Sequence, residues 1–121
     1  MNVLIIEDSL PTALMLQSFV SACGHQAMFE PSSWFACSAV DEWSFDLVLM
    51  DIVLPGIDGY ELAGRLRDKG LRVPIIAVTS LDDDPAKRRE YGIDGYIGKP
   101  VSMTQLKDLL EAYTTTLAKT A

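Results

Sequence analysis

The chain has 121 residues, of which 49% are hydrophobic and 22% charged, and a formal net charge of −7. This composition predicts one folded domain over residues 1–121 rather than a disordered chain. The longest apolar runs are about half a membrane span, so no membrane insertion is expected. The negative charge argues against direct nucleic-acid binding, and the absence of a secretory signal pattern predicts a cytoplasmic protein.

Strand-like apolar runs alternate with segments of helical periodicity, a pattern typical of βαβ units and a parallel sheet. The first predicted strand covers residues 2–7, and the first helix begins near Ser9 and ends at Gly24. Helical spacing places Leu10 and Leu14 away from the sheet. Five other residues of that helix are predicted to face the sheet: Thr12, Met15, Leu16, Phe19 and Val20.

The next segments predict an edge strand and a central strand. A short strand at 26–29 leads into a helix opened by Ser32 or Ser33. The strand at 46–51 is apolar on both faces, as expected when helices cover both sides of a sheet. Four residues of the second helix are expected in the core: Trp34, Phe35, Ala39 and Val40.

The C-terminal half continues the alternation. A third helix ends near Gly70, and strands follow at 73–79 and 95–98. The run Asp82-Asp83-Asp84-Pro85 is interpreted as the start of the fourth helix, because aspartate caps free N–H groups and proline fits the first turn. Ser102 and Gln105 form a capping box for the last helix. The ordered core is expected to end near residue 113, with a frayed tail at 114–121.

Four of the strand-like runs end on residues that can hold a phosphoryl group or a metal ion. These residues are Glu7-Asp8, Asp51, Thr79-Ser80 and Lys99-Pro100. In an open parallel sheet the crevice beyond the carboxyl ends of the strands is the usual binding site, so these residues should converge there. Clustered carboxylates repel one another unless a cation is bound, and their oxygens suit Mg²⁺, with Mn²⁺ as a substitute.

Asp51 is the candidate nucleophile of this crevice. A carboxylate can accept a phosphoryl group to form an aspartyl-phosphate, and no proton has to be removed for that step. The hydroxyl of Thr79 and the compact positive charge of Lys99 would then contact the phosphoryl oxygens. This chemistry explains why the crevice needs no histidine or cysteine as a base.

Taken together, these residues and the loop Pro55-Gly56-x-Asp58-Gly59 make the chain resemble the receiver domain of two-component response regulators. The resemblance covers Asn2 to about Tyr113, and the chain is similar to the single-domain chemotaxis-type receivers. It implies a flavodoxin-like α/β fold, doubly wound, with a five-stranded parallel sheet in the order 2-1-3-4-5 and five helices. Such a domain is a regulatory switch rather than an enzyme with a separate substrate.

The resemblance also implies roles for individual residues. Asp51 would accept phosphoryl from a histidine of a sensor kinase or a histidine phosphotransfer protein. Asp8 would bind Mg²⁺ directly, Glu7 would assist, and the backbone carbonyl of Val53 would be a further ligand. Thr79 and Lys99 would contact the phosphoryl group, and the Lys99-Pro100 peptide bond would be cis.

Two further features concern the response and the partners. Tyr96 matches the switch aromatic of receivers, which swings inward with the phosphoryl-bound threonine and remodels the face made by the fourth helix, fifth strand and fifth helix. Leu10, Leu14 and Val101 are expected to form an exposed apolar patch where the histidine-bearing partner docks. The remodelled face would regulate a downstream effector protein.

Val53 and Leu81 depart from many relatives, which have polar residues there that orient a hydrolytic water. Two apolar side chains predict slow dephosphorylation of Asp51. Val53 also argues against a phosphatase of the haloacid dehalogenase type, which needs a second aspartate two residues after the nucleophile. Two alternatives stay open: a degenerate receiver that is never phosphorylated and serves as an interaction module, and a receiver excised from a hybrid kinase or larger regulator.

Overall fold

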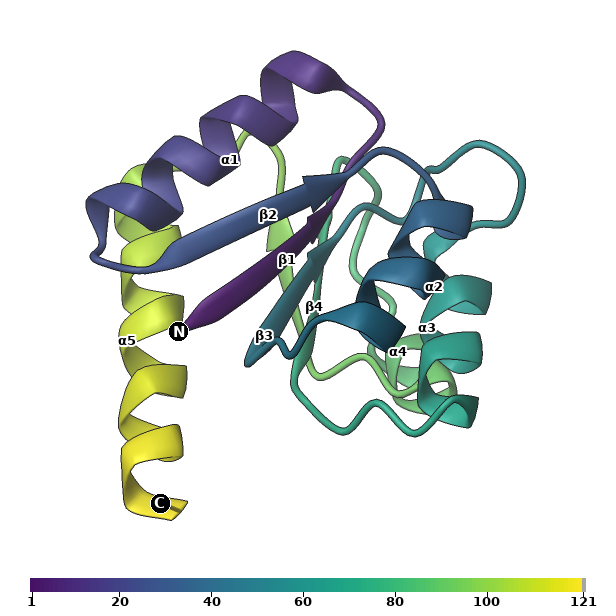
Figure 1. Ribbon diagram of the computed structural model, residues 1–121. Coiled ribbons are helices and arrows are strands. Elements are labelled where there is room, and N and C mark those ends of the chain that lie inside the picture. Colours follow the sequence, from purple (N-terminus) through teal and green to yellow (C-terminus); the bar gives the residue numbers. More distant parts are fainter. Residues whose placement is uncertain (121) are drawn as a thin grey trace.

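A five-stranded parallel sheet in the order β2-β1-β3-β4-β5 forms the centre of the molecule (Figure 1). The computed structural model describes the backbone of residues 1–120 and the side chains of residues 1–115. The strands are β1 (Asn2–Ile6), β2 (Gln26–Glu30), β3 (Leu47–Met50), β4 (Ile75–Thr79) and β5 (Gly95–Gly98). The predicted strand order and doubly wound fold are therefore confirmed.

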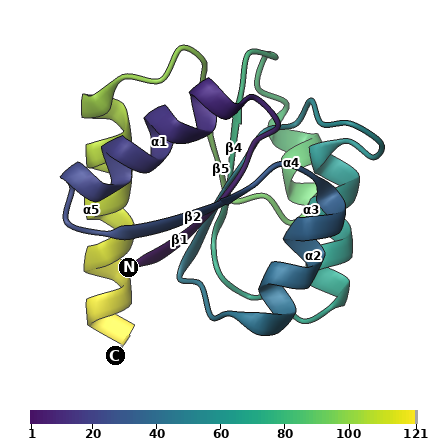
Figure 2. The same cartoon turned by 45° about the horizontal axis from the view of Figure 1, so that its top comes forward.

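Five helices cover the two faces of the sheet. Figures 1 and 2 show α1 (Leu10–Ala22) and α5 (Met103–Thr120) on one side, and α2 (Ser33–Glu42), α3 (Gly59–Asp68) and α4 (Pro85–Tyr91) on the other. Each crossover runs from one parallel strand to another through a helix, so every strand ends at the same edge of the sheet. No helix within residues 1–120 is long and apolar enough to cross a membrane.

Apolar residues fill both interfaces between sheet and helices. Every residue of β3 and β4 is buried, which explains their continuous apolar sequences. On one face, Ile5 and Leu49 pack with Leu16, Leu106 and other residues of α1 and α5. The two cores hold the strands rigidly, so the residues just beyond the strand ends have fixed positions.

Side-chain caps stabilise the starts of α3, α4 and α5, and the starts of α4 and α5 are those predicted. The Asp58 and Asp84 carboxylates accept from the backbone N–H groups of Glu61 (2.9 Å) and Lys87 (3.1 Å). At the start of α5, the N–H of Gln105 donates to the Ser102 hydroxyl, and the N–H of Ser102 donates to the Gln105 side chain. The acid run at 82–84 therefore begins a helix, as expected.

Helix α2 differs from its prediction, because Trp34 and Phe35 are not core residues. Their side chains are 76% and 51% exposed, whereas Ala36 and Ala39 are buried and Val40 is partly buried. At about 100° per residue, Trp34 lies on the side of the helix opposite Ala36. The small alanines face the sheet, and the large aromatic side chains face solvent.

Two smaller expectations also need adjustment. In α1, Leu16 and Val20 are buried as predicted, but the third buried residue is Ala13 rather than Thr12, which is only partly buried. Helix α5 continues to Thr120, past the expected end of the ordered core, and Thr114 donates to the Leu110 carbonyl within it. Fraying of this segment stays a prediction, and residue 121 lies outside the described residues.

Candidate functional site

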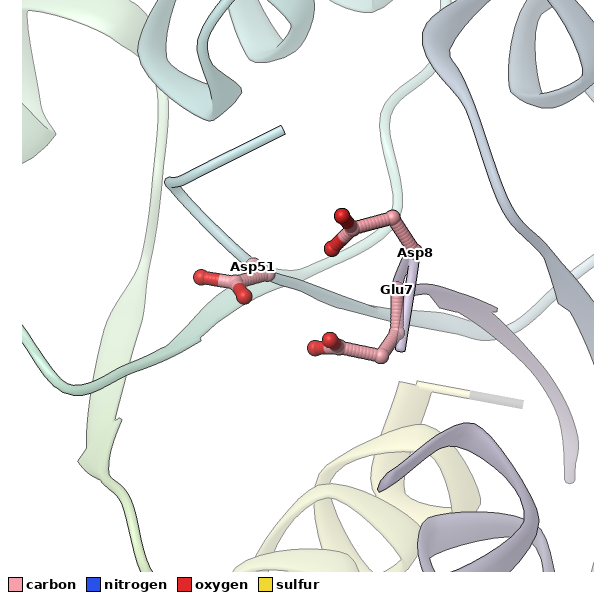
Figure 3. Close-up of side chains that lie close together, drawn as sticks. All are labelled: Glu7, Asp8 and Asp51. Carbon is pink, nitrogen blue, oxygen red and sulfur yellow. The ribbon is translucent and has the colours of Figure 1, made fainter. Parts of the chain in front are cut away.

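Three carboxylates meet at the carboxyl ends of β1 and β3. Glu7 and Asp8 follow β1 directly, and Asp51 follows β3; one ligand oxygen from each lies within 4.8 Å of the others. Figure 3 shows the Glu7 and Asp8 side chains extending towards the side on which Asp51 lies. Glu7 and Asp51 are buried and Asp8 is exposed. The convergence of these acids, expected from the sequence, is present.

Lys99 joins two of these acids. Its Nζ lies 2.8 Å from Glu7 Oε2 and 2.8 Å from Asp51 Oδ2. The lysine stands just beyond β5, and its backbone N–H donates to the Thr79 carbonyl at the end of β4 (2.9 Å). The Lys99-Pro100 peptide bond is cis, as the resemblance implies. One cation therefore lies between two buried carboxylates.

Burial and charge shift the protonation of this cluster. Burial raises the pKa of Glu7 above its ordinary 4.5, and the Asp51 charge adds to that rise against the lowering effect of the Lys99 hydrogen bond. Burial alone lowers the pKa of Lys99, but its hydrogen bonds to Asp51 and Glu7 outweigh burial and raise the pKa above 10.5. Lys99 therefore stays charged, and the crevice holds more negative charge than one lysine can neutralise.

Thr79 and Tyr96 are linked through the backbone of one residue, Leu81. Thr79 is buried at the end of β4, and its hydroxyl accepts the backbone N–H of Leu81 (3.3 Å). The Tyr96 hydroxyl donates to the carbonyl of the same Leu81 (2.6 Å). Sequence reasoning missed this link, although a threonine that accepts the N–H two residues on is a common local pattern. Leu81 therefore connects the predicted phosphoryl contact to the predicted switch aromatic.

The loop after β3 is shaped around Asp51. The N–H of Val53 donates to Asp51 Oδ1 (3.1 Å), which fixes one carboxylate oxygen. Gly59 packs directly on this loop, since a Cβ there would collide with the Asp51 carbonyl oxygen and Ile52 Cα. A larger residue at 59 would therefore displace the backbone of Asp51. The side chains of Val53 and Leu81 are 56% and 45% exposed and line one open hollow of about 420 Å³.

The expected docking patch is only partly formed. Leu10 and Leu14 of α1 are 57% and 45% exposed, as predicted. Val101 is only 6% exposed, and the prediction that it belongs to the patch is wrong. It packs with the core that includes Leu106 and Leu110 of α5.

The acidic cluster suits a hard divalent cation. Glu7, Asp8 and Asp51 provide carboxylate oxygens close together, and Mg²⁺ is typically bound by one or two carboxylates together with waters. Asp8 is exposed, so an ion and its waters can reach the cluster. Binding a cation would also relieve the excess negative charge around Glu7. The donor set therefore fits Mg²⁺.

Comparison with known proteins gives a consistent family. The family model of the response regulator receiver domain matches residues 3–111. The chain is 32% identical to the polar-differentiation response regulator DivK of Brucella ovis, over 93% of this chain and 94% of DivK. It is also 30% identical to the sensor histidine kinase RcsC of Salmonella typhi, over 99% of this chain. There the chain spans only 13% of the relative's length.

Solved structures support the same comparison. The receiver domain of the sensor histidine kinase PA1611 from Pseudomonas aeruginosa PAO1 superimposes with a TM-score of 0.82 at 27% sequence identity. The match covers 93% of this chain and 95% of that chain, and that structure has a magnesium ion coordinated in its active site cleft. The site described above therefore lies in a fold that other proteins share almost end to end.

Proposed function

Since this chain belongs to the response regulator receiver domain family, we propose that it is a phosphorylation-dependent signalling switch with Asp51 as phosphoacceptor. The observation that carries this proposal is the position of Asp51. Its carboxylate is buried at a strand end, lies beside Glu7 and Asp8, and is held by Lys99 at 2.8 Å. A carboxylate oriented in this way is suited to attack phosphorus.

The transfer step requires a phosphohistidine donor. An oxygen of Asp51 attacks the phosphorus, the O–P bond forms, and the N–P bond of the donor breaks with its electron pair staying on the imidazole nitrogen. The imidazole then takes up a proton from water. Lys99 and the Thr79 hydroxyl are placed to stabilise the phosphoryl oxygens, and no base on this chain is needed.

Glu7, Asp8, Asp51 and the Val53 carbonyl would hold Mg²⁺, with Mn²⁺ as a substitute. When bound, the ion supplies positive charge beside the phosphoryl oxygens. The cluster of three carboxylates with a single lysine supports this assignment, since charge remains to be neutralised.

We further propose that phosphorylation is read through Thr79, Leu81 and Tyr96. A phosphoryl group that draws Thr79 towards it would shift the backbone of Leu81, whose carbonyl accepts the Tyr96 hydroxyl. The face of α4, β5 and α5 would change as a result and bind an effector protein. The donor would be a sensor histidine kinase or histidine phosphotransfer protein docking near Leu10 and Leu14, in the cytoplasm.

The test is phosphorylation by acetyl phosphate in Mg²⁺ buffer, read by intact mass. We expect one added phosphoryl group, abolished by Asp51→Asn and by EDTA. Asp41→Asn is the matched control, because Asp41 is an exposed aspartate on α2, and it should leave the added mass unchanged. Unmodified wild-type protein would favour the alternative of a receiver that acts only as an interaction module.

A further inference from the structure

Helix α2 carries both of its aromatic residues on the side that faces solvent. Trp34, Phe35, Ser38, Asp41 and Glu42 are all exposed and recur at the spacing of one helix face, which we call the α2 outer face. The opposite side holds the buried Ala36 and Ala39. Trp34 is 76% exposed, although tryptophan is highly buried on average in folded proteins. Packing in the core therefore does not explain why Trp34 and Phe35 are aromatic.

The α2 outer face is ordered along the helix. Its aromatic residues lie in the first turn and its two acids lie in the last turn. The aromatic end begins shortly after Glu30, whose carbonyl accepts the backbone N–H of Glu7 (3.1 Å), so it lies at the same end of the sheet as the carboxylate site. A partner lying along this ridge would meet apolar surface at one end and negative charge at the other.

Most of the charge around this face is negative. Residues 1–64 contain no lysine or arginine, and all 10 such residues of the chain occur from Arg65 onward. One cation reaches the α2 outer face from α3: Lys69 Nζ lies 2.9 Å from Asp41 Oδ2. Within residues 1–115, Glu42 forms no ion pair, and neither does Glu30. Cationic groups of a partner are therefore the complement that this surface lacks.

We propose that the α2 outer face binds a positively charged amphipathic helix of another protein. The apolar side chains of that helix pack on Trp34 and Phe35, and its arginine or lysine residues pair with Glu42. Tryptophan anchors and arginine contacts are the residue types that dominate binding energy at protein interfaces, and arginine also stacks on tryptophan. This binding is independent of phosphorylation at Asp51, because it uses none of the residues assigned to that step.

The probe for this proposal is a synthetic amphipathic helical peptide of leucine and arginine, about 14 residues long to match a helix of four turns. A second peptide has glutamate in place of each arginine. The protein carries only two tryptophans, so Trp43→Phe leaves Trp34 as the single fluorescent reporter. We expect the arginine peptide to shift the Trp34 emission to shorter wavelength, as water leaves the indole, and the glutamate peptide to have no effect.

Variants distinguish this surface from others. Trp34→Ala and Glu42→Arg should each weaken binding of the labelled arginine peptide about tenfold or more, as expected for interface anchors. Trp43→Ala is the matched control, because Trp43 is also exposed (58%) but lies at the C-terminal end of α2 beside Met28 and Phe45. It should leave the affinity within about twofold. Unchanged thermal unfolding of each variant would show that the fold is retained.

Three results would overturn the proposal. They are equal binding of the glutamate peptide, unchanged affinity in Trp34→Ala, and self-association of the protein that Trp34→Ala abolishes, since the occupant would then be a second copy of this chain. Acetyl phosphate labelling of Asp51 in the same variants separates the two proposals. A variant that loses peptide binding but is still labelled by acetyl phosphate supports the α2 outer face and leaves the phosphorylation proposal unaffected.

Discussion

Lys99 shows how a single residue can hold the carboxylate site together. Removing its side chain leaves the buried Glu7 and Asp51 without their cation, and breaking a buried pair costs more than the pair contributes. Because Lys99 is itself 21% exposed, we expect Lys99→Met to lower the free energy of unfolding by about 2–3 kcal/mol in EDTA. Urea denaturation measures this loss.

Lys107→Met is the control for that experiment, since Lys107 is an exposed residue of α5. It should change the free energy of unfolding by less than about 0.5 kcal/mol. Added Mg²⁺ should restore part of the stability of Lys99→Met, because a bound cation replaces some of the missing charge. Equal losses in both lysine variants would show that the contacts of Lys99 contribute no special stability.

Val53 and Leu81 are the residues that we expect to set the lifetime of the proposed acyl phosphate at Asp51. Neither side chain can hydrogen-bond a water, and both line the same hollow beside the loop after β3. We expect Val53→Asn to shorten the lifetime of the acyl phosphate about tenfold, equivalent to ~1.4 kcal/mol of activation free energy. The measurement is intact mass against time after acetyl phosphate is removed.

The conservative variant Val53→Leu keeps an apolar side chain at the same position and should retain the wild-type lifetime. If Val53→Leu and Val53→Asn lose phosphate at the same faster rate, the polarity of residue 53 is not what controls hydrolysis. If neither changes it, water reaches Asp51 by another path.

At the scale of elements, α4 is fixed at its start by charge. The Arg88 guanidinium makes two hydrogen bonds to the Asp83 carboxylate (2.6 and 3.1 Å), and these hold the pKa of Asp83 below its ordinary 3.8. A lowered pKa means that the ionised form is favoured in the folded state. The stability contributed by this pair is present above pH 3.8 and is lost as the pH falls through the lowered pKa.

The corresponding experiment compares wild type with Asp83→Asn by urea denaturation. Because the pair is near the surface, the variant should be less stable by under about 1 kcal/mol at neutral pH. The difference should shrink once Asp83 is protonated in the wild type, well below its ordinary pKa. A difference that stays constant in acid would assign the effect to something other than the ion pair.

The elements also show which signals in the sequence were sufficient. The capping of α4 and α5 follows from local turn chemistry, and the meeting of Glu7, Asp8 and Asp51 follows because parallel strands end at one edge of a sheet. The strand order rests on the family resemblance. The exposure of Trp34 does not follow from its hydrophobicity, because it depends on the helical phase that the buried Ala36 and Ala39 set. The burial of Val101 depends on how the chain turns before α5, which no local pattern encodes.

At the scale of the whole molecule, one arginine ties four segments together. Arg67 of α3 uses all its N–H groups: they reach the carbonyls of Leu71, Val73 and Gly92 and a carboxylate oxygen of Asp94, at 2.7 to 3.0 Å. The same Asp94 oxygen accepts the N–H that begins β4. Arg67 therefore joins the ends of α3 and α4 to the beginnings of β4 and β5.

This arrangement requires a planar guanidinium, which lysine cannot replace. Arg67→Lys keeps the charge but leaves several of these oxygens without a donor, so we expect a loss of about 2–3 kcal/mol in the free energy of unfolding. Arg65→Lys is the matched control on the same helix, because Arg65 is 57% exposed and pairs only with Glu61 at 3.3 Å. It should lose less than about 0.5 kcal/mol.

Hydrogen exchange distinguishes a global effect from a local one. If Arg67 holds the ends of α3 and α4 to the beginnings of β4 and β5, Arg67→Lys should speed hydrogen exchange of the Ile93 and Asp94 amides. These amides donate to the carbonyls of Arg88 and Ile75. Amides of β1 should change only as much as the global stability does. Faster exchange throughout, with no extra effect at 93 and 94, would mean that Arg67 stabilises the molecule without acting as the link between these segments.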